Sequence, residues 1–273
     1  MRKIKSLIAG INTSDGAGVN LTRIIGSAAL DMLDPFLLLD EFGSDDPDDY
    51  IPGFPPHPHR GFETVTYMLN GKFKHKDTAG NEGCLTDGSV QWMTAGRGVV
   101  HSEMPEQTKG LIRGFQLWLN LPKEKKMIDP SYKDIQSEDI PLVIFDGGKV
   151  KVISGEYKST VGPGRPHTAV LYLDVHMDDK GSNINIPIKD NWNAFVYVYE
   201  GELNADIRVS KSMLAVLGTD GFFSCNAAID ETKFILVAGE PIGEPVVRGG
   251  PFVMNTKEEI LEAFDDYHSG KMG

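Results

Sequence analysis

Residues 56–71 read PHPHRGFETVTYMLNG, and this stretch decides the fold class that the sequence predicts. The part from residue 62 to 69 is rich in β-branched and aromatic residues, and the Asn70-Gly71 that follows is typical of a hairpin turn. Residues two apart on a strand point to the same side, so His57 and His59 can present both imidazoles to one point. On a helix the same spacing would splay them by roughly 200°. The stretch therefore predicts a β-strand region that carries a pair of histidine ligands.

Further runs of strand type recur at residues 90–93, 114–119, 168–176 and 195–199. Short strands that alternate with turns predict a β-sandwich or barrel. Two helices are also expected. An apolar stripe at 24–33 predicts a short one, and the capping-box spacing of Thr256 and Glu259, with Gly270 after the end, predicts one at the C-terminus.

Part of the opening stretch recurs later in the chain. FETVTYMLNG at 62–71 parallels WNAFVYVYEG at 192–201, an interval of about 130 residues, which suggests a duplicated domain. Residues 121–141, rich in Lys, Glu, Asp and Pro, are interpreted as the connector. We expect an N-terminal domain at 1–125 and a C-terminal domain at 126–273.

Charge and cysteine content limit the classes of partner and compartment. The chain has 27 Lys and Arg against 39 Asp and Glu, a net charge of -12, which disfavours direct binding to nucleic acid or to anionic membranes. The nearest basic cluster, Lys123, Lys125 and Lys126, is interpreted as a solvated turn. Two distant cysteines outside any CxxC pair, and no signal peptide or long apolar run, predict a cytoplasmic protein that does not span a membrane.

A second pair of candidate ligands lies 42 residues after the first. His101 and Glu103 follow the turn-forming Gly96-Arg97-Gly98 and share a face if the chain is extended there. On a strand beside the first pair, they would complete a site of three histidines and one carboxylate, with positions open for water or substrate. The alternative is that His59 or Glu103 is a hydrogen-bonded structural group.

The remaining candidates are weaker. Glu63 is either a fifth ligand or a carboxylate that accepts a ring N–H from a ligand histidine, and we favour the second interpretation. The other histidines lack partners at ligand spacing and are expected to be ordinary surface or core residues: His75, His167, His176 and His268.

These motifs together resemble the pirin family. The resemblance rests on residues 57–67, on Thr94-Ala95-Gly96-Arg97-Gly98 with His101-Ser102-Glu103, and on GGPFVMNT at 249–256, with DPF at 34–36 and LDEF at 39–42 in support. It implies an all-β bicupin of two antiparallel jelly-roll barrels with a few short helices. It also implies one metal ion, usually iron, with Mn, Ni, Cu, Zn and Co as further occupants, held by His57, His59, His101 and Glu103. Relatives are reported as quercetin 2,3-dioxygenases or as regulators that act through partner proteins.

Two function hypotheses follow. The first is a quercetinase-like oxidoreductase that opens the central ring of a flavonol with O2 and uses Glu103 as the catalytic base. Neighbouring apolar residues then line a planar pocket or form the barrel core: Phe54, Phe62, Met68, Trp92 and Met93. The alternative is a metal-tuned binding module that docks on a partner enzyme or transcription factor, with the acidic segment 40–49 as the only candidate docking feature.

Two further expectations concern competing chemistry and the second domain. A sugar-phosphate isomerase ranks third, because only Arg60 and Arg97 lie close to the motifs to bind a phosphate. Aligning Gly71 with Gly201 puts Pro187 and Lys189 opposite His57 and His59. Neither residue has a lone pair to give, so we expect the C-terminal domain to hold no metal.

Overall fold

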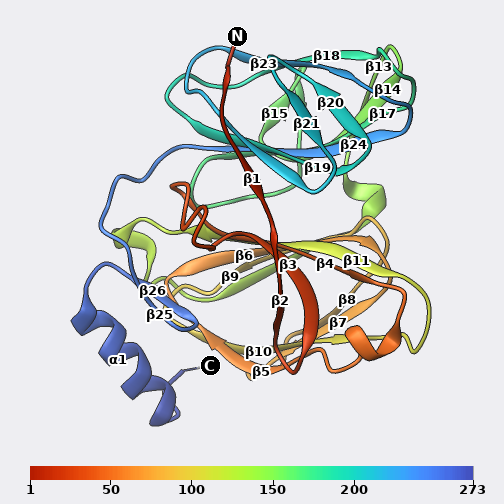
Figure 1. Ribbon diagram of the computed structural model, residues 1–273. Helices are drawn as coiled ribbons and strands as arrows, with labels where there is room; N and C mark the ends of the chain where they lie inside the picture. The colour runs from red at the N-terminus through yellow and green to blue at the C-terminus, as the bar shows by residue number, and fades with distance from the viewer. Residues whose placement is uncertain (273) are drawn as a thin grey trace. The chain divides into compact units, whose positions relative to one another are not determined.

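The structure is a computed structural model that describes residues 1–272. Over these residues the chain is all-β apart from one α-helix and three short 3-10 turns at Pro47–Asp49, Lys123–Lys125 and Ser137–Asp139 (Figure 1). The predicted all-β fold class is confirmed. None of the helices in this described part is long and apolar enough to cross a membrane.

Two compact units collect segments from both halves of the sequence. Unit 1 contains Met1–Gly10, Ser27–Pro35 and Glu138–Pro241, and unit 2 contains Ile11–Gly26, Phe36–Ser137 and the segment from residue 242 onward. The predicted domain boundary between residues 125 and 126 stays a prediction.

Unit 1 has a seven-stranded sheet in the order β1-β22-β19-β24-β17-β14-β13, a four-stranded sheet in the order β18-β23-β20-β21, and the pair β15-β16. A large continuous cluster of buried apolar side chains lies in its core. The strands are β1 (Ile4–Ala9), β13 (Leu142–Phe145), β14 (Gly148–Ser154), β15 (Glu156–Tyr157), β16 (Thr160–Val161), β17 (Val170–Met177), β18 (Asn183–Pro187), β19 (Asn193–Glu200), β20 (Glu202–Asn204), β21 (Arg208–Ser210), β22 (Met213–Leu217), β23 (Phe222–Ala227) and β24 (Thr232–Gly239).

Unit 2 repeats this plan, with a seven-stranded sheet in the order β12-β9-β6-β11-β4-β3-β2, a four-stranded sheet in the order β5-β10-β7-β8, and the pair β25-β26. Its interior differs, because several smaller apolar clusters flank buried polar side chains. The strands are β2 (Ile11–Asp15), β3 (Val19–Ile25), β4 (Phe36–Ser44), β5 (Phe54–His59), β6 (Phe62–Asn70), β7 (Phe73–Asp77), β8 (Glu82–Leu85), β9 (Val90–Thr94), β10 (Val99–Pro105), β11 (Ile112–Asn120), β12 (Ser131–Ile135), β25 (Val247–Gly249) and β26 (Phe252–Met254).

The C-terminal helix is confirmed as α1 (Lys257–His268), which packs against β25 and β26. The Thr256 hydroxyl accepts a hydrogen bond from the Glu259 backbone N–H, and the Glu259 side chain accepts one from the Thr256 backbone N–H. This capping box satisfies two backbone donors at the helix start. Gly270 follows the helix with φ of 70°.

The expected helix at 24–33 is wrong. Ile24 and Ile25 are the fully buried end of β3, and a register shift against β4 occurs between Arg23 and Ile25. Such a bulge turns two successive side chains toward buried surroundings, which produces an apolar run without a helix. Gly26, with φ of 93°, then ends the strand.

The hairpin expected at Asn70-Gly71 is also wrong, although β6 itself is confirmed. β6 pairs with β9 and β11, whereas β7, which follows the turn, pairs with β8 and β10 in the other sheet. The turn therefore carries the chain from one sheet of unit 2 to the other. The expected connector at 121–141 likewise contains a paired strand, β12.

Candidate metal centre

Three histidines converge between two neighbouring strands of unit 2. β5 and β10 pair antiparallel, with His57 opposite His101 and His59 opposite Val99. Each histidine offers one ring nitrogen, and these nitrogens all lie within 4.8 Å of one another. The ring centroids are separated by 4.5 Å for His57 and His101, 4.7 Å for His57 and His59, and 5.1 Å for His59 and His101. The expected placement of the two motifs on neighbouring strands is confirmed.

Hydrogen bonding leaves ring nitrogens of this group available to a cation. The carbonyl of Pro55 can only accept, so His57 Nδ1–H donates to it (2.8 Å), which leaves the lone pair on Nε2. Both ring nitrogens of His101, and Nδ1 of His59, are buried and have no hydrogen-bond partner among the described residues. Burying such atoms unpaired is costly, and metal ligation would satisfy one ring nitrogen of each histidine. The donor set therefore fits a divalent transition metal.

Burial keeps the imidazoles of His59 and His101 neutral, as metal ligation requires. Burial, reinforced by the neighbouring His101 and His57, holds the pKa of His59 well below its usual value. Burial, with smaller contributions from His57 and His75, lowers the pKa of His101 to about 3. A neutral imidazole has a lone pair to give, so both side chains can act as ligands near neutral pH.

Glu103 lies on β10 with the histidines but is bonded elsewhere. Its Oε1 is 3.0 Å from Thr66 Oγ1, and its Oε2 accepts a hydrogen bond from Gln116 Nε2 (3.2 Å). Thr66 Oγ1 is also 2.7 Å from Gln116 Oε1. A register shift between His101 and Glu103 accompanies this arrangement, and the group of close ligand atoms contains the three histidines without Glu103. Glu103 as a fourth ligand stays a prediction.

Glu63 faces away from this site. Glu63 and Thr66 are three positions apart on β6, and the pairing of this strand with β9 is regular over Glu63–Tyr67. Their side chains therefore lie on opposite faces of the strand. The Glu63 carboxylate accepts a hydrogen bond from the Thr94 hydroxyl (2.8 Å) and is fully buried. This geometry argues against its interpretation as a partner of a ligand histidine.

Anchors on both sides hold the segment that follows His59. Arg60 is buried and donates to the Arg97 carbonyl (2.6 Å) and to Asp266 of α1 (2.9 Å). Arg97 in turn pairs with Asp129 (2.8 Å). Neither arginine is among the residues that line the cavity described below, so these two side chains are not placed to bind a phosphate there.

Lys126 is an anchor that sequence reasoning missed. It is 1% exposed, and its ammonium donates to the Gly61 carbonyl (2.7 Å), the Val253 carbonyl (3.0 Å) and Asn120 Oδ1 (2.6 Å). The interpretation of this residue as part of a solvated turn is wrong. Only the tertiary fold brings the three acceptors together, so the local sequence contained no signal for it.

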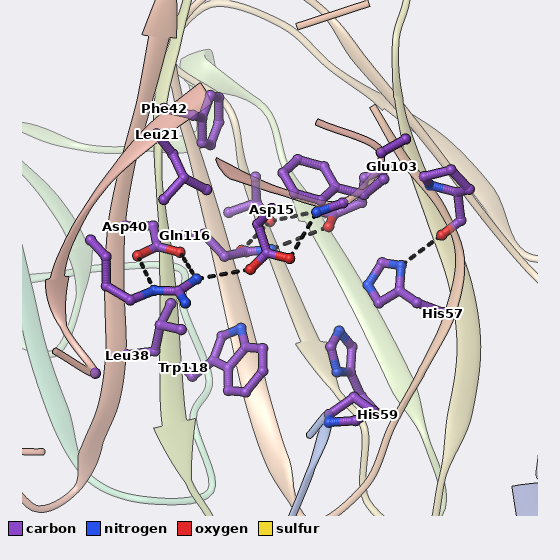
Figure 2. A pocket seen from close by; sticks show the side chains of 18 of the residues that line it. Asp15, Leu21, Leu38, Asp40, Phe42, His57, His59, Glu103, Gln116 and Trp118 are labelled. Atoms are coloured by element: carbon purple, nitrogen blue, oxygen red, sulfur yellow. Dashed lines mark hydrogen bonds and ion pairs between the residues drawn. The ribbon is translucent and has the colours of Figure 1, made fainter. Parts of the chain in front are cut away.

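A cavity of about 710 Å³ opens beside His57 and His59, a size common for small-molecule sites (Figure 2). Of the apolar residues expected in a planar pocket, only Phe54 lines it, whereas Phe62, Met68, Trp92 and Met93 are buried in the core. Its other walls come from strands of the large sheet and from the C-terminal segment: Leu38, Asp40, Phe42, Thr66, Gln116, Trp118, Arg248, Gly250 and Pro251. No sequence signal identified Asp40 or Gln116 as lining residues, because other polar residues such as Glu41 and Arg113 lie in the same two strands.

The remaining histidines are surface or core residues, as expected. His75 is buried and pairs with Asp134 (2.8 Å), and His176 pairs with Asp174 (3.0 Å). His167 and His268 are exposed.

Two β-sheets with a group of three histidines that could hold a metal ion are typical of the cupin class. The family model described as Pirin matches residues 18–119, and the model described as Pirin C-terminal cupin domain matches residues 172–273. The chain belongs to the pirin family, and its predicted bicupin fold is confirmed.

Individual relatives agree along the whole chain. A Pirin-like protein of Caulobacter vibrioides is 47% identical over 274 residues, covering 99% of this chain and 99% of that protein. Pirin of Rattus norvegicus is 43% identical over 279 residues, which cover 100% of this chain and 94% of that protein. A crystal structure of quercetin 2,3-dioxygenase from Acinetobacter baumannii matches with a TM-score of 0.93 at 35% identity, covering 100% and 99%.

Proposed function

We propose that this protein is a metal-dependent dioxygenase that opens the central ring of a flavonol such as quercetin. The observation that carries the proposal is the group of three close histidines, of which His57 and His59 line a cavity large enough for such a substrate. The likeness to the Acinetobacter baumannii structure titled quercetin 2,3-dioxygenase supports the same activity.

In this proposal His57, His59 and His101 hold one divalent ion, with iron as the first candidate and Mn, Ni, Cu, Zn and Co as others. When bound, the ion supplies a Lewis acid for a substrate hydroxyl and a centre for O2 chemistry. Trp118, Leu38 and Phe42 line the cavity and would orient a flat aromatic substrate beside the histidines. Their apolar surfaces would also limit access of water to the reacting ring.

Hydrogen-bond counting supports Glu103 as the base that takes the proton of the substrate hydroxyl. Thr66 has one hydroxyl proton but lies within hydrogen-bond distance of two acceptors, Glu103 Oε1 (3.0 Å) and Gln116 Oε1 (2.7 Å). A proton on Glu103 Oε1 would close the ring, because Glu103 would donate to Thr66, Thr66 to Gln116, and Gln116 to Glu103 Oε2. The network thus offers a place for the transferred proton. It supports the role of base more directly than that of fourth ligand.

The expected metal content is one tightly bound ion per chain. In unit 1, Pro187 ends β18, and Ile184, Ile186 and Ile188 from the same segment join a continuous apolar cluster. The aliphatic side chains of these isoleucines offer no lone pairs for a cation. Elemental analysis of the purified protein should therefore give about one ion per chain, and none in a His57→Ala variant. Close to two tightly bound ions per chain would contradict this expectation.

A further inference from the structure

A second polar group lies in the wall of the cavity. Arg23 on β3 and Asp40 on β4 are paired in register. Arg23 Nε donates to Asp40 Oδ1 (3.0 Å), and Nη2 donates both to Asp40 Oδ2 (2.8 Å) and to Asp15 Oδ2 (2.8 Å). All three residues line the cavity, and Asp40 is only 4% exposed. We call these three residues the arginine subsite.

The arginine subsite is separate from the histidine group. Figure 2 shows Asp40 and Leu38 on one side of the cavity and His57 on the other, with Trp118 between them. Leu38 and Trp118 are opposite each other across β4 and β11, so an apolar surface connects the two polar ends. A flat ligand held at the histidines would extend along this surface toward Arg23.

Hydrogen-bond capacity indicates what the arginine subsite would recognise. Arg23 Nη1 has no hydrogen-bond partner among the described residues, so its two N–H groups remain to donate. Each Asp40 oxygen accepts one bond from Arg23 and can accept another. A ligand group that both accepts and donates fits this arrangement, and a hydroxyl is the simplest such group.

The charge of the arginine subsite itself disfavours an anionic ligand group, and Arg248 is a separate cation of the cavity wall. The arginine subsite contains two carboxylates and one guanidinium. A carboxylate or phosphate would meet a net negative charge, whereas a neutral hydroxyl would not. A buried ion pair adds little stability over apolar residues of similar volume, so stability alone gives little reason to place one in a cavity wall.

We propose that Arg23, Asp40 and Asp15 bind a neutral phenolic hydroxyl on the part of an aromatic ligand that lies remote from the metal. This inference rests on the proposed function, in which the histidine group takes the other end of a flavonol. The preferred substrates would then be flavonols that carry hydroxyls on the ring farthest from the metal-binding hydroxyl.

The test compares three flavonols whose remote ring has two, one or no hydroxyls: quercetin, kaempferol and galangin. Dissociation constants are measured without O2, and kcat/KM with O2, on the metal-loaded full-length protein. Because hydrogen bonds to charged groups are strong, the parent should bind quercetin about 10- to 100-fold more tightly than galangin. The double variant Arg23→Met with Asp40→Leu should lose this preference and bind galangin as the parent does. It replaces the whole pair, so no charge is left buried alone.

A matched control replaces another arginine–carboxylate pair of the same sheet. Arg113 and Glu41 pair at 2.8 Å, and Glu41 is adjacent to Asp40 and so on the opposite face of β4. Arg113→Met with Glu41→Met should leave the preference for quercetin unchanged. A preference that survives in the Arg23 and Asp40 double variant, or an equal loss for all three flavonols, would overturn the arginine subsite.

The two proposals fail in different ways. Turnover of all three flavonols with no preference would overturn the arginine subsite and leave the dioxygenase standing. Binding with the expected preference but no turnover would overturn the dioxygenase alone. No binding of any flavonol by the metal-loaded protein would overturn both.

Discussion

Glutamine in place of Glu103 is expected to lower flavonol turnover by about 10²- to 10⁴-fold, the range typical of losing a positioned acid–base group. Glutamine keeps an oxygen at nearly the same place and can still bond Thr66 and Gln116, which contact the carboxylate at 3.0 and 3.2 Å. The variant should therefore fold and keep its metal. It loses the charge and the capacity to take a proton. Oxygen uptake with quercetin by metal-loaded protein, together with metal analysis, measures the effect.

His57→Ala is the control for this experiment, because it should empty the metal site and abolish activity altogether. A metal-loaded Glu103→Gln protein with the parent rate would refute the role of Glu103 as base. If the parent protein itself consumed no oxygen with each candidate metal, the alternative of a metal-tuned binding module would gain support. The Glu103→Gln substitution should then shift the affinity for a partner instead.

The histidine group could be predicted from the sequence because its geometry is local. Two residues separated by one position share a face of any strand, so His57 and His59 had to point together once the segment was extended. The pairing of β5 with β10 is long-range, but the repeated ligand spacing indicated it in advance. What local pattern cannot reveal is the sheet that a strand joins. This limit explains the wrong hairpin at Asn70-Gly71.

The polar interior of unit 2 could not be predicted, because it depends on the register of six strands. Adjacent strands of the large sheet place polar side chains directly opposite one another in a single row. The row consists of Arg23, Asp40, Gln116, Thr66, Gln91 and Asp134. Its members are irregularly spaced along the chain, and each taken alone is an unremarkable polar residue in a strand. Thr66 and Gln116, which bond Glu103, belong to this row, as do Arg23 and Asp40 of the arginine subsite.

Methionine in place of Lys126 is expected to lower the free energy of unfolding by about 2–4 kcal/mol. Methionine keeps the apolar stem but leaves the Gly61 and Val253 carbonyls and Asn120 without the buried donor that they share. Burial also makes the Lys126 charge costly, which offsets part of the loss. Because Gly61 closely follows His59, weaker metal binding should accompany the lower stability. Denaturant unfolding of the metal-free protein measures the stability effect, and metal titration the second.

Two comparisons distinguish the effect of losing the Lys126 hydrogen bonds from a general effect of removing a lysine. Lys123 is exposed, so Lys123→Met should change stability by less than about 0.5 kcal/mol.

Burial lowers the pKa of Lys126 from 10.5 to about 8, so the unfolded chain binds this proton more tightly than the folded chain. Stability of the parent should therefore rise between about pH 8 and pH 10.5, and the Lys126→Met variant should lack that contribution. If the Lys123→Met and Lys126→Met variants had equal free energies of unfolding across this pH range, the hydrogen bonds of the Lys126 ammonium would contribute nothing to stability.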